Sequence, residues 1–364
     1  KDQQLSMSFY RSLDENDQVV HFKVFHAEQP VPLSDVMPVF ENMGFRVIGE
    51  HPYETVDRDG HTVWLHDFML TTKTLQSIDI EKIRQPFEDL FTKVWVGEAE
   101  NDSFNRMLIS AYMTWREIAV LRSYSRYMRQ IRISNSQEFI SNTIVSNVDI
   151  SKLLIRLFDS RFNPLLIRQN DTEDVEQSLL ENEFIEALDK VENLTEDKIL
   201  RLYLDLIKAT SRTNFYQQDK NGEDKSYIAF KLQPRLIPNV PLPVPMFEIF
   251  VYSPRIEGVH LRGGKVARGG LRWSDRYEDY RTEVLGLVKA QQVKNAVIVP
   301  VGAKGGFVAK MLPDTGRDDF MKEGISCYQT FITGLLNVTD NLVDGKVVKP
   351  TNVVCHDDDD YYLV

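Results

Sequence analysis

The stretch ARGGLRWSDRYEDYRTEVLGLVKAQQVKNAVIVPVGAKGGFVAK, residues 267–310, decides how the chain is interpreted, because glycine clusters and cations alternate along it. Between residues 256 and 310 there are ten Lys or Arg against five Asp or Glu, a local balance of +5 within a chain of net charge −11. A region of this kind attracts small anions. The segment therefore predicts an anion site inside an otherwise acidic protein.

Two glycine-rich runs supply the backbone of the predicted site, GVHLRGGKVARGGLRWSDR at 258–276 and VPVGAKGGF at 299–307. Glycine pairs flank Lys265 and Arg268, so the backbone can approach a ligand closely while the cations offer partners for a carboxylate or a phosphate. Paired glycines also occur in β-bulges and tight turns that bind nothing. The pattern therefore favours an anion site without requiring one.

The segment between the two runs predicts a helix over 280–295, followed by a short buried strand at 296–300. Lys294 then lies at the helix C-terminus, where a cation is favourable even without a ligand. A glycine-rich turn that carries Lys304 is predicted after this strand. Such a turn can hold a general acid or base, but it is also a common place for a surface lysine. The chain contains neither G-x-x-x-x-G-K-[ST] nor G-x-G-x-x-G, so no nucleotide-binding motif is found.

The rest of the chain predicts a multidomain α+β protein of three regions. Residues 1–75 read as a small α/β unit with strands at 19–27, 45–56 and 62–70, which resembles an ACT-type regulatory domain and equally fits a plain packing module. Residues 76–215 show helical periodicity, including one long run over 105–130. Residues 216–364 begin with a polar loop and a segment with four prolines at 236–245, then carry the glycine-rich site.

Composition and charge favour some partners and disfavour others. The net charge disfavours nucleic acid, and no apolar run is long enough for a membrane span. Two cysteines are too few for a disulfide framework, which fits the cytoplasm. Arg122, Arg126 and Arg129 are interpreted as a solvated helix face paired with acidic neighbours. His356 and the aspartates at 357–360 are interpreted as an acidic loop, and no metal site is predicted.

Residues 267–310 resemble the substrate-domain core of the glutamate, leucine, phenylalanine and valine dehydrogenases, where a K-G-G-x-R segment, a helix-end lysine and a G-G-[AG]-K-G-G turn line one pocket. The flanking runs FEIFVYSPRIEGVHLRGGKVARGGLRWSDR and YQTFITGLLNVTDNLVDGKVV are similar, more narrowly, to the large bacterial NAD-dependent glutamate dehydrogenases. That family carries ACT-like and helical regions ahead of its catalytic core. The resemblance implies an α/β substrate-binding domain like that of amino-acid dehydrogenases at 216–364.

The resemblance also implies roles for individual residues. Lys304 corresponds to the catalytic lysine that works on the water and on the amine-bearing carbon, although one glycine fewer precedes it here. Lys294 corresponds to the lysine that holds the substrate α-carboxylate. Arg268 stands at the K-G-G lysine that meets the side-chain carboxylate, with Lys265 as the alternative. The remaining substrate-binding positions implied are Gly269, Gly270, Arg272 and Gly302.

The implied reaction is the reversible NAD-dependent oxidative deamination of L-glutamate to 2-oxoglutarate and ammonia. The resemblance implies NAD as cofactor, with its Rossmann domain and a catalytic aspartate expected beyond residue 364, so the chain is expected to be a fragment of a homo-oligomeric enzyme; its cofactor-binding residues are unknown. An alternative is a regulatory or assembly module without catalysis, in which residues 1–75 sense an amino acid. A further alternative is a Schiff-base lysine enzyme.

Overall fold

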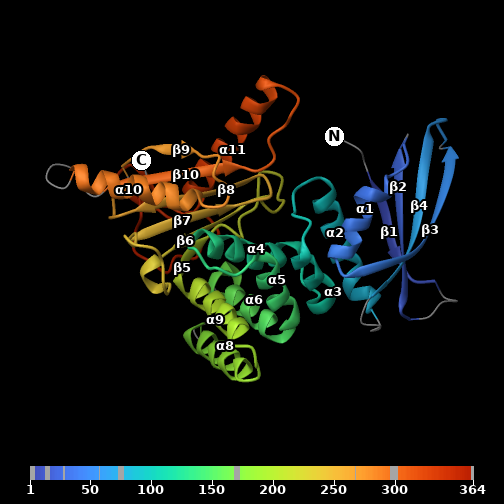
Figure 1. Ribbon diagram of the computed structural model, residues 1–364, viewed down its shortest axis with the longest axis horizontal. Helices are drawn as coiled ribbons and strands as arrows, with labels where there is room; N and C mark the ends of the chain where they lie inside the picture. Colours follow the sequence, from blue (N-terminus) through green and yellow to red (C-terminus); the bar gives the residue numbers. More distant parts are fainter. Residues whose placement is uncertain are drawn as a thin grey trace. The chain divides into compact units, whose positions relative to one another are not determined.

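The computed structural model describes the backbone of residues 5–12, 17–27, 29–56, 58–72, 78–167, 173–266, 268–295 and 302–361, and the side chains of these residues except 173, 174 and 292–295. The chain forms two compact units, Lys1–Leu121 and Arg122–Val364 (Figure 1). The strand predicted at 296–300 lies outside the described residues, as does the side chain of Lys294.

An antiparallel sheet of four strands organises the first unit. Its strands are β1 (Ser6–Tyr10), β2 (Val19–Ala27), β3 (Phe45–Val56) and β4 (Thr62–Thr72), in the spatial order β1-β2-β4-β3. The predicted strands at 19–27, 45–56 and 62–70 are confirmed. Strand β1 was not predicted, because its five residues SMSFY are too few to show clear alternation.

Phenylalanine side chains hold two helices on one face of this sheet. The helices are α1 (Leu33–Asn42) and α2 (Ile80–Trp95). The ring of Phe22 on β2 lies 5.7 Å from that of Phe40 on α1 and 4.9 Å from that of Phe87 on α2. Edge-to-face ring pairs at such distances stabilise beyond the burial of their area.

The predicted helical run over 105–130 is broken into separate helices. A 3-10 helix, η1 (Ser103–Arg106), leads into α3 (Met107–Ala111), and α4 (Trp115–Gln130) follows, crossing the boundary between the units. Tyr112 takes a left-handed conformation with φ of 56° and ends α3, its backbone N–H donating to the carbonyl of Met107. The helical character predicted for 105–130 is thus divided between separate helices, because a residue in the left-handed conformation ends a helix.

The second unit combines a six-stranded sheet with helices on both faces. Its helices after α4 are α5 (Gln137–Ser146), α6 (Val148–Phe162), α7 (Pro164–Ile167), α8 (Glu173–Leu188), α9 (Leu194–Ala209), the 3-10 helix η2 (Pro234–Leu236), α10 (Tyr280–Asn295) and α11 (Arg317–Asn337). Its sheet strands are β5 (Thr210–Thr213), β6 (Ile228–Leu232), β7 (Phe247–Tyr252), β8 (Ile256–Arg262), β9 (Leu271–Trp273) and β10 (Ala303–Ala309); β11 (Asn341–Val343) and β12 (Lys346–Val348) form a separate hairpin.

The sheet order is β5-β6-β7-β8-β10-β9, and among the described strands only β9 and β10 pair in parallel. Helix α10 connects those two strands. The ring of Tyr124 on α4 packs at a tilt against that of Phe230 on β6, with centroids 4.7 Å apart, so α4 lies on one face of the sheet. Val284 of α10 contacts Gly306 on that same face.

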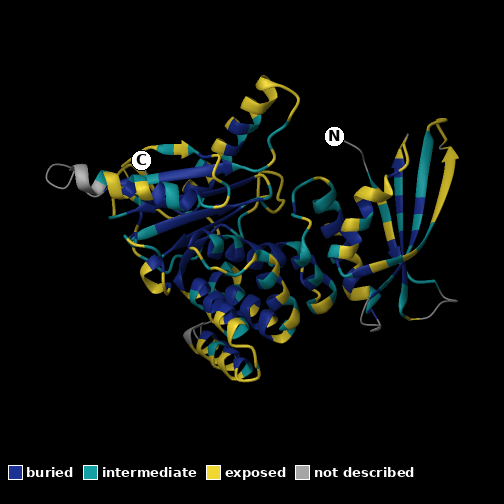
Figure 2. Ribbon diagram, in the orientation of Figure 1, coloured by how far each residue is buried: buried dark blue, intermediate teal, exposed yellow. Residues whose placement is uncertain are grey.

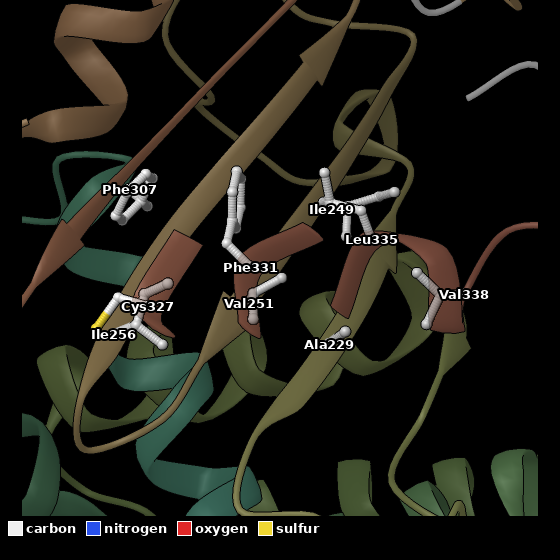
Figure 3. Packing of buried hydrophobic residues seen from close by; sticks show 9 residues of the cluster. All are labelled: Ala229, Ile249, Val251, Ile256, Phe307, Cys327, Phe331, Leu335 and Val338. Atoms are coloured by element: carbon white, nitrogen blue, oxygen red, sulfur yellow. The ribbon is translucent and has the colours of Figure 1, made fainter. Parts of the chain in front are cut away.

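Helix α11 covers the opposite face, where its residues interdigitate with those of the strands (Figure 3). The packed set is Ala229, Ile249, Val251, Ile256, Phe307, Cys327, Phe331, Leu335 and Val338, each at most 2% exposed. Dense packing of this kind fixes the distance between α11 and β10. The strands that carry the predicted site are therefore held between α10 and α11.

The observed division differs from the three regions expected from the sequence. Helix α2, expected in the helical region, packs on the first sheet, and α5 to α9 share a unit with the six-stranded sheet. The mixed α/β architecture itself agrees with the prediction. No helix among the described residues is both long and apolar enough to cross a membrane.

The interpretation of Arg122, Arg126 and Arg129 as a solvated face was wrong. Arg122 is only 1% exposed, and the side chains of Arg126 and Arg129 are 15% and 18% exposed. Arg126 approaches the fully buried Glu257, and Arg129 pairs with Glu278 at 3.2 Å. The expected acidic neighbours exist, but they come from strands and loops distant in sequence, which bury the helix face.

Candidate active site

Lys304 lies inside a strand and not on a turn. Strand β10 runs between β8, to which it is antiparallel, and β9, to which it is parallel. The glycines that suggested a turn instead allow neighbouring side chains to lie close to the strand. A methyl group at Gly305 would lie 2.4 Å from Leu271 Cδ2, and one at Gly306 would lie 2.5 Å from Val284 Cγ2. Glycine in a strand interior often marks such an approach.

The two glycine-rich runs of the sequence meet at the start of β10. The N–H of Ala303 donates to the carbonyl of Arg268 at 2.9 Å, and the N–H of Gly305 donates to the carbonyl of Gly270 at 3.2 Å. A methyl group at Gly269 would lie 1.5 Å from the carbonyl oxygen of Ala303. No side chain fits there, so glycine at 269 is required for the segment Arg268–Gly270, called the RGG segment below, to lie against β10.

Lys304 occupies the α10 face of the sheet. Phe307 points toward α11, and alternation along the strand sends residues 304 and 306 to the other face. Its side chain is partly buried, and a methyl group at Gly270 would lie 4.0 Å from its Nζ. Among the residues that the structure describes, no carboxylate pairs with Lys304. Its ammonium group is therefore available to a ligand from the side of the RGG segment.

Gln291 is a further polar group beside the start of β10, and it was not among the predicted site residues. A methyl group at the buried Gly302 would lie 2.1 Å from Gln291 Nε2, so the amide covers that glycine two residues before Lys304. Gln291 lies on α10, one helical turn before Lys294. That i, i+3 spacing on a predicted helix is the sequence signal that could have identified it.

The other predicted cations differ in how they are engaged. Arg268 is exposed and has no ion pair within the described part of the chain. Arg272 is half-exposed and its Nε lies 2.7 Å from Glu283, which also accepts a hydrogen bond from Ser274 at 2.6 Å. Arg272 thus fastens β9 to α10. Lys265 is 58% exposed and lies 3.8 Å from Asp358.

The acidic loop at 357–360 folds onto buried cations at the ends of the strands. Asp360 accepts two hydrogen bonds from Arg262, at 2.9 and 2.7 Å, and lies 2.5 Å from Lys231. Asp357 pairs with Lys231 at 2.6 Å and with Arg212. Burial acts to raise the pKa of Asp360, but the hydrogen bonds from Arg262 hold that pKa below its ordinary value.

This ion-paired loop reaches the strand that carries Lys304. Arg262 stands opposite Ala303 in the β8–β10 register, so the Asp360 ion pair lies beside the start of β10. The backbone of Asp360 also exchanges hydrogen bonds with Asp340, its N–H donating to the carboxylate at 2.6 Å and its carbonyl accepting from the Asp340 N–H at 2.8 Å. The loop is thereby fixed to the sheet at several points.

Together these contacts bring Lys304 next to the segment Arg268–Gly270 on the sheet of a mixed α/β protein. Models of three protein-family domains match this chain. They are a bacterial NAD-glutamate dehydrogenase catalytic domain over 183–364, a glutamate dehydrogenase ACT3 domain over 4–83, and a glutamate dehydrogenase helical motif 3 over 99–164. The chain belongs to the bacterial NAD-glutamate dehydrogenase family.

Relatives agree with this family along nearly the whole chain. Proteins named NAD-specific glutamate dehydrogenase from Pseudomonas aeruginosa and Halomonas elongata are 56% and 54% identical over 99% of the chain, and one from Mycobacterium tuberculosis is 42% identical over 91%. The chain spans about a fifth of the length of these relatives, 22%, 22% and 21% respectively.

Proposed function

We propose that this chain is part of an enzyme that catalyses the reversible oxidative deamination of L-glutamate, with Lys304 as its catalytic lysine. The overall reaction converts glutamate, NAD⁺ and water to 2-oxoglutarate, ammonium, NADH and a proton. The observation that carries the proposal is the approach of the RGG segment to β10, which leaves the ammonium of Lys304 facing Gly270 without a carboxylate partner among the described residues.

The substrate has two carboxylates, so two cationic groups besides Lys304 are needed to hold it. For the side-chain carboxylate we favour Arg268 over Lys265, because Lys265 lies near Asp358 whereas Arg268 has no ion pair in the described part of the chain. A guanidinium binds a carboxylate through two parallel hydrogen bonds. Lys294 is assigned the α-carboxylate from the family motif alone. Holding both ends of the substrate orients its Cα–H bond.

Lys304 then moves protons at the reacting carbon. A partly buried amine beside the Cα of the substrate can deprotonate the attacking water and later protonate the departing amine. When bound, NAD⁺ accepts the hydride from Cα.

Substitution of Lys304 in the full-length enzyme tests the proposal. Lys304→Ala should lower kcat for glutamate-dependent NADH formation by about 100- to 10,000-fold, the usual contribution of a general acid or base. Lys289→Ala removes an exposed lysine of α10 and serves as the matched control with unchanged kcat. A Lys304→Ala enzyme with near-normal kcat overturns the assignment.

The choice between Arg268 and Lys265 is tested with two substrates. Arg268→Ala should raise KM for glutamate by about 10- to 100-fold, corresponding to the loss of a charge-assisted hydrogen bond. The same change should affect L-norvaline little, because that amino acid lacks the side-chain carboxylate. If Lys265→Ala shows this selective effect and Arg268→Ala does not, the carboxylate belongs to Lys265.

A further inference from the structure

The last turn of α4 ends against the start of α10. Figure 2 shows α4 largely in the dark blue of buried residues, and Gln130, its last residue, is 1% exposed. A buried carboxamide destabilises a fold unless its nitrogen and oxygen find hydrogen-bond partners. The side chain of Gln130 finds them at the beginning of α10 and in the turn before it.

The amide of Gln130 bridges the turn between β9 and α10. Its Nε2 donates to the carbonyls of Tyr277 and Glu278, each at 3.3 Å, and its Oε1 accepts from the backbone N–H of Arg281 at 3.2 Å. The first N–H groups of a helix have no partner within that helix, so the Gln130 oxygen caps α10 from outside. Three hydrogen bonds to backbone atoms therefore hold the chain itself in position where α10 begins.

The ion pairs around this amide hold side chains and not the backbone. Arg281 pairs with Glu248 on β7 at 2.8 and 2.7 Å, and both side chains are at most 1% exposed. Arg129 pairs with Glu278 at 3.2 Å, and its guanidinium carbon lies 4.5 Å from the centre of the Tyr277 ring. Because long side chains have several rotatable bonds, these pairs can keep α10 attached while its backbone shifts. Loss of the amide should therefore displace the start of α10 without detaching the helix.

Two different parts of the fold hold the groups that are assigned to the substrate. Lys304 and the RGG segment are held in the sheet, by the pairing of β10 with β8 and β9 and by the hydrogen bond from Ala303 to the carbonyl of Arg268. Lys294 belongs to the last turn of α10, a helix of 16 residues. A shift where the helix begins is carried to that turn, about 24 Å away.

We propose that Gln130 is a positioning residue for the substrate. By capping α10 from α4, it sets the distance between the group that holds the α-carboxylate and the groups that lie in the sheet. The inference rests on the proposed function, which assigns Lys294 to the α-carboxylate. Every α-amino acid has this carboxylate, so the effect of Gln130 should not depend on the substrate's side chain, in contrast to the effect of Arg268.

Steady-state kinetics of the full-length enzyme test the proposal. Gln130→Met replaces the amide by an apolar group of similar length, and Gln130→Ala removes it without putting another group in its place. The matched control is Gln137→Met. The Gln137 amide joins α5 to α4, where its Nε2 donates to the Ser125 carbonyl at 3.0 Å and its Oε1 accepts from the Ser125 hydroxyl at 2.8 Å. Thermal unfolding of each variant verifies that it is folded.

Both Gln130 variants should bind all α-amino acids more weakly. The KM for glutamate and the inhibition constant of L-norvaline against glutamate should each rise by about tenfold, because a small misplacement of a binding group costs much of its interaction. The value of kcat should stay within about threefold and its pH profile should not move, because Lys304 keeps its place in the sheet. Gln137→Met should leave the KM and the inhibition constant unchanged.

Three results would overturn the proposal: an unchanged KM in both Gln130 variants, an equal rise in Gln137→Met, or a rise for glutamate without one for L-norvaline. The first would show that the cap does not reach the substrate, the second that any loosening of α4 has the same effect, and the third that the side-chain carboxylate is affected. A wild-type enzyme that forms no NADH from glutamate would refute the proposed function and this inference with it, so the two failures are distinguishable.

Discussion

Arg262 and Asp360 form a bidentate, fully enclosed ion pair, with Nη1 to Oδ1 at 2.9 Å and Nη2 to Oδ2 at 2.7 Å. Their side chains are 1% and 5% exposed. The pair joins the last residue of β8 to the acidic loop and lies opposite Ala303, the first residue of β10. It therefore couples the position of the loop to that of the strand with Lys304.

Asp360→Asn should destabilise the second unit by about 3 to 5 kcal/mol, because it leaves Arg262 buried with an uncompensated charge, whereas Lys231 keeps its pair with Asp357. The matched control is Asp358→Asn, whose carboxylate is 91% exposed and 3.8 Å from Lys265, with an expected change below about 1 kcal/mol. Urea unfolding followed by tryptophan fluorescence measures both. Equal effects of the two substitutions would contradict the buried-pair argument.

Acid should weaken the buried ion pairs that Asp340 and Asp360 form with Arg212 and Arg262. The folded-state pKa values of Asp340 and Asp360 lie below their ordinary values, since hydrogen bonds from Arg212 and Arg262 outweigh the effect of burial. A lowered folded pKa gives stability that is present above the unfolded pKa of about 4 and is lost as pH falls through the folded pKa. The free energy of unfolding should therefore fall steeply below about pH 4.

The Asp360→Asn variant is the control for this pH dependence. It lacks one of the carboxylates that must be protonated, so its free energy of unfolding should change less per pH unit in the acidic range. Denaturant unfolding at a series of pH values gives the two slopes. Identical slopes for the two proteins would show that Asp360 has the same pKa folded and unfolded.

Gly269→Ala should disrupt the contact between the RGG segment and β10, because the added methyl group would lie 1.5 Å from the Ala303 carbonyl oxygen. Forcing the backbones apart should cost about 1 to 3 kcal/mol of stability and raise KM for glutamate in the full-length enzyme. Gly286→Ala is the control: it lies within α10 with no atom near the added methyl, and it should stabilise by up to about 1 kcal/mol. An unchanged KM for Gly269→Ala would show that the RGG segment does not contribute to substrate binding.

Cys327 should react very slowly with thiol reagents in the folded protein. Burial, aided by the hydrogen bond to Glu323, raises the pKa of its thiol to about 12, and the residue is 1% exposed. At pH 8 the thiolate fraction is then about 10⁻⁴, and the reaction should be at least about a thousandfold slower than for a free cysteine. Labelling with and without denaturant, read by mass spectrometry at Cys327, measures the ratio; rapid labelling of the native protein would mean that α11 opens.

The features that follow local rules could be predicted from the sequence. Short β-like runs between turn signals identified β2, β3 and β4 with nearly their observed ends, and helical spacing identified α10. These properties depend on residues within about ten positions of each other, so one sequence suffices to show them.

The features that were missed depend on distant partners. Lys304 was placed on a turn because its glycines were interpreted as hinges, whereas they admit Leu271 and Val284 against the strand. Arg122 was expected in solvent, although the fold buries it. The Arg262–Asp360 pair joins residues 98 positions apart, and nothing local marks it. Periodicity carries no information about such pairs.

Glycines on β8 and β10 leave the surface of these strands without side chains of their own, and neighbouring elements fill the space. Phe331 of α11 occupies the position above Gly258, and Val284 of α10 the position above Gly306. On the face of the sheet that Lys304 shares with Gly306, the surface is thus shaped by a residue of α10, and helices tolerate exchange more readily than a central strand. Changes on α10 can therefore alter the surroundings of Lys304 while the strands keep their sequence.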